Sequence, residues 1–355
     1  MNSTATPLLD VHGLVKHFPL KKDVFGRGGG VVRAVDGVSF AVRSGETLGV
    51  VGESGCGKST TARLLMKLIA PNQGEILFDA CTVGSRDLPL KDYRRQVQMV
   101  FQDSYASLNP RLTTQDSIAF GPQVHGLPRA DAVARARDLL ARVGLDPRRF
   151  AERYPHELSG GQRQRVNIAR ALALQPRLII LDEAVSALDK SVEAQVLNLL
   201  LDLKDEFGLT YVFISHDLNV VRCISNRVMV MYLGQVVEIG ASEDLFTAPR
   251  HPYTRALLSS IPSMDPDRRT EVPPLAGDPP NPINPPPGCR FHTRCPQAQA
   301  VCAQRVPALA CGDSGAGGGG GGGGDRGEHG HRVACLMHEP GSGHSAAPAL
   351  AEVAA

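Results

Sequence analysis

A loop at positions 52–59, Gly-Glu-Ser-Gly-Cys-Gly-Lys-Ser, constrains the fold of this chain more than any other feature. It fits the pattern G-x-x-x-x-G-K-[ST] and lies between a β-branched run at 47–51 and a helical pattern at 59–69, which is the context that this motif requires. Glycines let the backbone turn so tightly that consecutive N–H groups face anionic oxygens, and the helix N-terminus adds its dipole. We therefore expect Lys58 to reach the β- and γ-phosphates of a nucleotide and Ser59 to ligate Mg²⁺. The alternative, a chance Gly-rich turn, is disfavoured by the flanking strand and helix.

Short β-rich runs alternate with helical patterns from about residue 8 to residue 240. The expected strands are 47–51, 97–101, 178–181, 211–214 and 227–232, and the expected helices are 59–69, 131–143, 160–174 and 192–206. This alternation predicts an α/β fold with a largely parallel sheet. The block at about 103–174 is mostly helical and is interpreted as an insertion into a domain that spans residues 1–247.

The composition changes after residue 248. Eight prolines between 273 and 287 predict an extended stretch, and five cysteines follow between Cys289 and Cys335. We interpret 248–340 as a small Pro- and Cys-rich extension, Gly317 to Gly324 as a flexible loop without function, and 341–355 as a disordered tail.

Charge and hydropathy exclude several classes of protein. The net charge of +2 argues against a nucleic-acid binder whose affinity rests on bulk positive charge. A bilayer span needs about 20 mostly apolar residues, and the apolar runs here are far shorter. The first ten residues lack a signal-peptide pattern. We expect a cytosolic chain that does not itself span a membrane but can dock onto a membrane protein.

Two carboxylates end the apolar run at 178–181. Asp182 is suited to hold the shell of a Mg²⁺ ion, and Glu183 to polarise an attacking water. Taken alone, the pair is better explained as a polar strand end, but the loop at 52–59 favours the catalytic interpretation.

A second anion site is predicted at 158–162, Leu-Ser-Gly-Gly-Gln. Ser159 can cap the helix that follows, while Gly160 and Gly161 expose bare N–H groups at its start. One chain does not need two γ-phosphate sites for one nucleotide, so this site is interpreted as serving a nucleotide held by another chain. An ordinary capped helix would explain Ser159 but not the paired glycines with Gln162.

Over about residues 8 to 335 the sequence resembles the ATP-binding subunits of ABC transporters, which have a P-loop NTPase (RecA-like) core with a helical subdomain. The resemblance implies Asp182 and Glu183 on the Walker B strand, Gln102 as the glutamine that senses Mg²⁺, and His216 as a γ-phosphate contact. A proline common after the Walker B glutamate is Ala184 here, for which we expect no loss of chemistry. The residues that would bind ATP in this chain or its partner are Phe18, Gly52, Glu53, Ser54, Gly55, Cys56, Gly57, Lys58, Ser59, Thr60, Ser159, Gly160, Gly161, Gln162 and Asp189, the last in the D-loop that starts with Ser186 and Ala187. For Phe18, which would stack on adenine, a place in the core near an edge strand stays open.

Several strings resemble one subgroup, the dipeptide/oligopeptide importers, and within it the second ATPase subunit. They are 98–103, 105–111, 251–254 and the Pro/Cys-rich segment at 279–302. The resemblance implies a second ATPase (by family practice a paralogue), two permeases and an external binding protein, with this chain on the cytoplasmic face of the membrane. A permease helix would dock on about 105–126. A nickel, glutathione or other small-solute importer stays possible, as does a soluble ABC ATPase without a transport role.

Four thiols in the extension form a candidate metal site. Cys289, Cys295, Cys302 and Cys335 are separated by five, six and thirty-two residues, with Cys311 as a spare. Cytosolic thiolates hold Zn²⁺ or a [4Fe–4S] cluster, and no gap here is as short as the C-x₂₋₄-C of structural zinc sites, which favours iron–sulfur. Free thiols are the alternative, and if the metal is zinc His292, His329 or His331 can substitute as ligands. The other cysteines, Cys56, Cys81 and Cys223, are expected to pack in the core.

Overall fold

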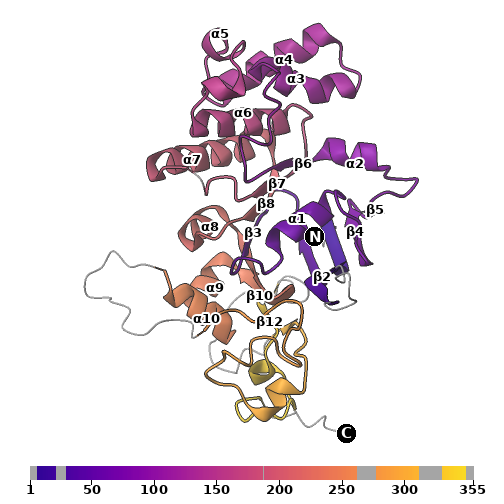
Figure 1. Cartoon of the computed structure of the whole chain (residues 1–355), viewed down its shortest axis with the longest axis vertical. Coiled ribbons are helices and arrows are strands. Elements are labelled where there is room, and N and C mark those ends of the chain that lie inside the picture. The colour runs from indigo at the N-terminus through magenta and orange to yellow at the C-terminus, as the bar shows by residue number, and fades with distance from the viewer. Residues whose placement is uncertain (1–5, 21–28, 187, 262–276, 312–329, 349–355) are drawn as a thin grey trace, which may run out of the picture.

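A computed structural model describes residues 6–20, 29–186, 188–261, 277–311 and 330–348. The molecule is elongated (Figure 1), with helices at one end, two sheets in the middle and the C-terminal segment at the other end. None of the helices in the described ranges has the length and hydropathy to cross a bilayer.

The larger sheet contains the strands that the sequence predicts. β6 (Val97–Val100), β7 (Leu178–Asp182), β8 (Thr210–Ile214), β3 (Thr47–Val51) and β9 (Arg227–Tyr232) pair in parallel in that order. The antiparallel strand β10 (Gln235–Ala241) and the short antiparallel strands β12 (Arg332–Val333) and β11 (Ala310–Cys311) extend the sheet beyond β9. Every residue of β3, β7 and β8 is buried. The predicted parallel α/β core is confirmed.

A second, antiparallel sheet was not predicted. It contains β2 (Val31–Val42), β1 (Leu9–Pro19), β4 (Gln73–Phe78) and β5 (Cys81–Thr82), in that order. The pairing of β1 with β2 changes register three times, between Val11 and Leu14, at Val15 and after Lys16. Each irregularity interrupts the alternation of inward and outward side chains, so the two-residue period that would identify these strands is broken.

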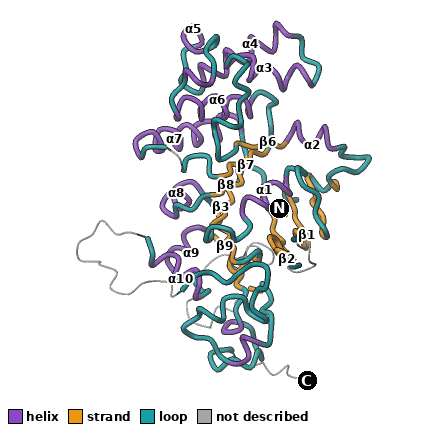
Figure 2. Tube along the Cα trace, viewed as in Figure 1, coloured by secondary structure: helices purple, strands orange, loops and turns teal. Residues whose placement is uncertain are grey.

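Helices flank the larger sheet (Figure 2). They are α1 (Lys58–Leu65), α2 (Leu90–Gln96), α7 (Lys190–Phe207), α8 (Leu218–Ile224), α9 (Ser242–Thr247) and α10 (Pro252–Ser259). α1 ends earlier than expected because Lys67 takes a left-handed backbone conformation with φ 51°. α7 ends at Gly208, whose φ of 62° is the conformation that glycine adopts freely.

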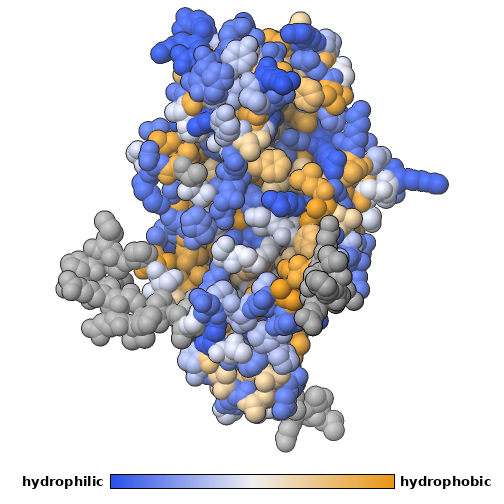
Figure 3. Space-filling view, viewed as in Figure 1, coloured by the Kyte–Doolittle hydropathy of each residue, from blue (hydrophilic) through white to orange (hydrophobic). Residues whose placement is uncertain are grey.

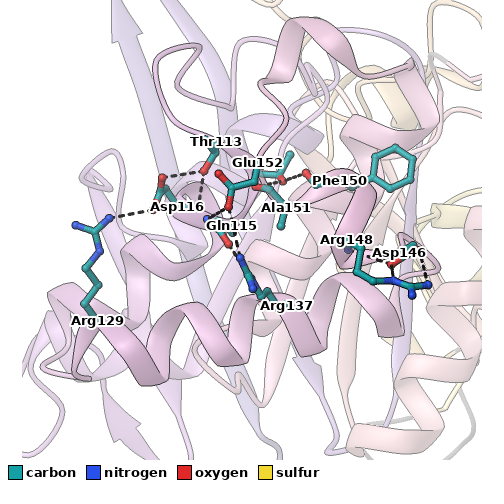
Figure 4. Close-up of polar contacts among 11 residues, drawn as sticks. Thr113, Gln115, Asp116, Arg129, Arg137, Asp146, Arg148, Phe150, Ala151 and Glu152 are labelled. Atoms are coloured by element: carbon teal, nitrogen blue, oxygen red, sulfur yellow. Dashed lines mark hydrogen bonds and ion pairs between the residues drawn. The ribbon is translucent and has the colours of Figure 1, made fainter.

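The helical insertion contains α3 (Thr114–Val124), α4 (Arg129–Arg142), α5 (Pro147–Phe150) and α6 (Gly160–Leu172), with a 3₁₀ turn at Pro155–Glu157. Polar contacts tie the start of α3 to the segment after α5 (Figure 4). Thr114 donates to the carbonyl of Ala151 at 2.9 Å, and Gln115 donates to Glu152 at 3.0 Å. Arg137 of α4 donates to Gln115 at 2.9 Å. These contacts hold three elements of the insertion together.

The C-terminal segment is mostly loop, with 3₁₀ turns at Ala300–Ala303 and Leu336–His338. Its order extends further than the sequence predicts. Ser342 and His344 are buried, and His344 Nε2 lies 3.0 Å from the carbonyl oxygen of Gln297. The prediction of a disordered tail is therefore wrong for 341–348, where a buried imidazole anchors the chain; 349–355 and Gly317 to Gly324 lie outside the described residues.

Candidate nucleotide site

The loop between β3 and α1 has the backbone that its glycines predict. Gly52 has φ 149° and Gly57 has φ 107°. A Cβ atom at either position would lie 2.2 Å from a carbonyl oxygen, that of Met231 or of Ala34. Only glycine fits such a close approach. Lys58 is buried and its Nζ donates to the carbonyl of Gly52 at 2.7 Å and of Glu53 at 3.1 Å, so its ammonium group lies inside the curve of the loop.

Ser59 and Asp182 lie together as a Mg²⁺ site requires. Ser59 Oγ donates to Asp182 Oδ1 at 2.9 Å, across from α1 to the end of β7. Burial raises the pKa of Asp182, and the neighbouring Glu183 also raises it. A divalent cation would offset the cost of this buried carboxylate, and hydroxyl and carboxylate oxygens are the ligands that Mg²⁺ prefers.

Three side chains meet at one carboxylate oxygen beside that pair. Gln102 Nε2 donates to Glu183 Oε2 at 2.7 Å, and His216 Nδ1 lies 3.6 Å from the same oxygen. They follow β6, β7 and β8, which are neighbours in the sheet, so the carboxyl ends of three parallel strands bring them together. Glu183 has φ 48°, a conformation that a non-glycine residue rarely adopts.

A cavity of about 280 Å³ lies over the loop. Its lining includes Val32, Ala34, Lys58, Gln102 and Glu183, together with Ser54, Gly55, Gly57, Ser59 and Thr60. Phe18 pairs with Val32 in the β1–β2 ladder and leaves 38% of its surface exposed. The ring thus lies on β1 beside the edge strand β2, whose Val32 lines the cavity, and it is not part of the buried core.

The segment at 158–162 begins α6 with a reciprocal cap. Ser159 Oγ accepts from the N–H of Gln162 at 3.3 Å, and the side chain of Gln162 accepts from the N–H of Ser159 at 3.0 Å. Packing also favours glycine at position 161, because a Cβ atom there would lie 2.5 Å from Cγ1 of Val192 on α7. Leu188 packs against the core and Asp189 precedes α7, whereas Ala187 lies outside the described residues. The prediction that these groups act on another chain's nucleotide stays a prediction.

The four predicted metal ligands line one small cavity. Cys289, Cys295, Cys302 and Cys335 all border it, with His292. Burial raises the pKa of Cys289 to about 11 and that of Cys335 to about 12, so in the structure as described these are thiols and not thiolates. Within the described residues, no group of three or more His, Cys, Asp or Glu side chains is arranged to hold a metal ion.

The remaining cysteine and histidine predictions differ in outcome. His331 Nε2 donates to the carboxylate of Glu238 at 2.7 Å, and Cys311 is exposed in β11. His329 lies outside the described residues. Cys56 is buried as expected, but Cys223 is exposed, because it occupies the solvent face of α8.

Tyr253 of α10 and Arg294 of the C-terminal segment contact the phosphate-binding loop, and neither is among the site residues expected from the sequence. Tyr253 Oη accepts from the N–H of Glu53 at 2.9 Å, and Arg294 donates to the Glu53 carboxylate. Tyr253 lies in the string at 251–254 that resembles the importer subgroup, so the sequence singles out its neighbourhood but not its contact with Glu53. Arg294 likewise lies in the segment at 279–302 that resembles the subgroup, but the sequence there does not indicate a contact with Glu53.

This loop, the Ser59–Asp182 pair and the parallel sheet beneath them define a P-loop nucleoside triphosphatase. Two family models match the chain: "ABC transporter" over residues 35–186 and "Oligopeptide/dipeptide transporter, C-terminal region" over residues 237–302.

Similar proteins include the "Probable peptide ABC transporter ATP-binding protein y4tS" of Sinorhizobium fredii, 55% identical over 85% of this chain and 86% of that protein. The "Oligopeptide transport ATP-binding protein AppF" of Bacillus subtilis is 51% identical over 84% of this chain and 92% of its own length. A solved dimer of the ATP-binding cassette MJ0796, bound to ADP and Pi, matches 66% of this chain and 98% of its own with a TM-score of 0.57 at 29% identity. The chain belongs to the ATP-binding subunits of the ABC transporter family, and is an ATPase of that class.

Proposed function

We propose that the protein is the ATP-hydrolysing subunit of an ABC importer and energises the uptake of dipeptides or oligopeptides through partner permeases. The observation that carries the ATPase part is the convergence of Gln102 and His216 on Glu183, beside the Ser59–Asp182 pair. The peptide part is supported by the match to the oligopeptide/dipeptide C-terminal region and by relatives whose names carry peptide transport.

The chain's own residues divide the chemistry among them. Lys58 would leave the two loop carbonyls and move to the phosphate oxygens, while the loop N–H groups hold the remaining charge. Ser59 and Asp182 would hold Mg²⁺, which when bound neutralises charge on the phosphates. Glu183 would orient the attacking water, and His216 would contact the transferred phosphate.

A second ATPase subunit would complete the site. Ser159, Gly160, Gly161 and Gln162 of each chain would close on the nucleotide held by the other, with Asp189 close by. ATP binding would close this clamp, and hydrolysis would reopen it. By family practice the second subunit is a paralogue.

The other proposed partners are two permeases and an external binding protein, which would place the chain on the cytoplasmic face of the membrane. Tyr105, Phe120 and Val124 leave more than half of their surface exposed within the segment expected to receive a permease helix. In Figure 3, apolar groups also lie among hydrophilic ones at the upper end of the molecule, where Figure 1 places the helical insertion. Exposed apolar groups within the segment that the resemblance assigns to a permease contact support the proposal that a permease docks there.

We propose as the finer cofactor assignment that Cys289, Cys295, Cys302 and Cys335 ligate a [4Fe–4S] cluster, or otherwise zinc. Support comes from their common cavity and their spacing. Burial raises the pKa of the Cys289 and Cys335 thiols, and no group of three or more His, Cys, Asp or Glu among the described residues is arranged to hold a metal. Ligation would therefore require deprotonation of these thiols and small shifts of the loop.

Anaerobic purification with iron, sulfide and zinc analysis tests this assignment. We expect a brown protein that contains iron and sulfide. The colour, iron and sulfide should be lost in Cys295→Ser and retained in the exposed control Cys223→Ser. A colourless protein with stoichiometric zinc would replace the cluster by a zinc site, and a metal-free protein with four titratable thiols in this segment would remove both.

Uptake by a strain that lacks the gene tests the transport proposal. Complementation with the wild-type chain should restore uptake of labelled dipeptides and oligopeptides, and Lys58→Ala should not. Restored uptake of nickel or glutathione alone would favour the alternative importers. If the tagged chain copurifies with no polytopic membrane protein and no solute uptake changes, a soluble ABC ATPase is the better assignment.

A further inference from the structure

Glu53, the second residue of the phosphate-binding loop, forms an ion pair with Arg294 of the C-terminal segment. Arg294 Nη1 donates to Glu53 Oε2 at 2.9 Å, and Arg294 Nη2 donates to Oε1 at 3.1 Å. Only 6% of the Arg294 side chain is exposed, and 21% of that of Glu53. A two-bonded guanidinium–carboxylate pair that is largely shielded from water fixes direction as well as distance.

The main chain of the same residue is held by a second group. Tyr253 Oη accepts from the N–H of Glu53 at 2.9 Å, and the Tyr253 ring is fully buried. Its centroid lies 4.6 Å from that of Tyr232 and 5.4 Å from that of Phe291. Arg294 also donates to Tyr232 Oη at 3.3 Å. The two groups that hold Glu53 are therefore parts of one packed aromatic cluster.

The third polar group of Glu53 faces the nucleotide site. Its carbonyl oxygen accepts from Lys58 Nζ at 3.1 Å. The N–H, the carbonyl and the carboxylate of one residue thus contact Tyr253, Lys58 and Arg294. Any displacement of Glu53 would move the backbone that carries the phosphate-facing N–H groups.

Charge gives this contact a second effect. A carboxylate beside a loop that binds a triphosphate repels the ligand, and that repulsion is strong where water is partly excluded. Arg294 neutralises the carboxylate without entering the cavity, whose lining does not include it.

We propose that Arg294, supported by Tyr253, is a positioning residue for ATP binding: the C-terminal segment fixes the shape of the phosphate-binding loop and cancels the charge of Glu53. The proposal rests on the nucleotide site assigned above. It gives this extension a direct effect on nucleotide affinity, in addition to any role of its cysteines.

The test is a double-mutant cycle on the purified full-length chain, with MgATP dissociation constants measured by calorimetry. Arg294→Met should weaken ATP binding about tenfold, the range that a charge-assisted hydrogen bond supports. Arg294→Lys should recover only part of the loss, because an ammonium group cannot make the two-bonded contact. Glu53→Gln combined with Arg294→Met should bind more tightly than Arg294→Met alone, because the unneutralised carboxylate is gone.

The matched control is Arg305→Met. Arg305 donates to Glu339 at 2.7 Å, so that this ion pair lies wholly within the C-terminal segment. This variant should leave the ATP dissociation constant unchanged. In the assembled complex, Arg294→Met should raise KM for ATP and retain kcat at saturating ATP. Equal effects of Arg294→Met and Arg305→Met, or additive effects of the Glu53 and Arg294 changes, would overturn the proposal.

Lys58→Ala separates this proposal from the site assignment. If Lys58→Ala binds ATP like the wild type, the nucleotide site itself is wrong. If Lys58→Ala loses ATP and Arg294→Met does not, the site stands and only the positioning role fails.

Discussion

The side-chain amide of Gln102 donates a hydrogen bond to Glu183, with Nε2 2.7 Å from Oε2. The proposed water-orienting carboxylate is thus occupied by the residue that the ABC resemblance assigns to Mg²⁺. Entry of MgATP would draw Gln102 toward the metal and release Glu183 for water. In the proposed site, this one contact would link nucleotide occupancy to the availability of Glu183 as a base.

His216→Ala should lower kcat for ATP about 100-fold, as loss of one donor to a transition-state oxygen does elsewhere. The His216 side chain is 61% exposed, so its removal leaves no cavity and folding should be unaffected. Steady-state hydrolysis by the assembled complex measures the effect. The exposed His12→Ala is the control, and equal activities of the two variants would remove His216 from catalysis.

Asp182→Asn should raise the melting temperature of the metal-free protein at pH 7. Because burial raises the folded-state pKa of Asp182, its ionisation costs stability above the ordinary aspartate pKa, and that cost vanishes as the pH falls toward that value. The advantage of asparagine should therefore shrink on acidification. In the wild type, MgATP should raise the melting temperature more than ATP with EDTA does. In Asp182→Asn this additional effect of Mg²⁺ should be lost. An unchanged Mg²⁺ effect would contradict the assignment of Asp182.

Gly161→Ala should destabilise the fold by about 1–3 kcal/mol, the usual cost of an overpacked contact. The added methyl group would meet Val192 Cγ1 at 2.5 Å, whereas a methyl group at Gly160 would lie 3.7 Å from Leu188 Cδ2 in ordinary contact. Gly160→Ala should therefore change stability by less than about 1 kcal/mol. Denaturant unfolding measures the free energy of unfolding of both variants. Equal losses of stability would show that packing between α6 and α7 is not the reason for glycine at position 161.

Ser159→Arg should leave ATP binding by the isolated chain intact and prevent closure with the partner. A bulky cation would occupy the space intended for the partner's γ-phosphate, while Lys58 and Ser59 are untouched. Calorimetry on the isolated chain and ATP-dependent association with the partner report the two steps separately. Loss of ATP binding in the isolated chain would show that Ser159 acts in cis.

The core of the site could be predicted because short strings encode it. The loop at 52–59 specifies its own backbone, and Asp182 and Glu183 follow a strand whose burial is evident from its apolar run. Parallel strands then bring their carboxyl ends to one edge, which places Gln102 and His216 beside Glu183.

The features that were missed depend on relations the sequence does not display. β1 and β2 could not be predicted from the sequence because their register shifts break the two-residue period of inward and outward side chains. Arg294 and Glu53 are 241 residues apart, and only the folded aromatic cluster brings them together. The ordered part of the tail likewise depends on contacts between distant positions, such as that of the buried His344 with Gln297.

Glu183→Gln in the reconstituted complex tests the central claim most directly. The amide retains the shape of the side chain but cannot accept a proton from water, so general-base catalysis worth about 10²–10⁴-fold should be lost while ATP affinity is kept. The partner subunit must carry its own matched substitution, because its site can otherwise supply turnover. We predict that hydrolysis falls at least about 100-fold and that the ATP-bound closed dimer accumulates; hydrolysis near the wild-type rate with ATP bound would contradict the account.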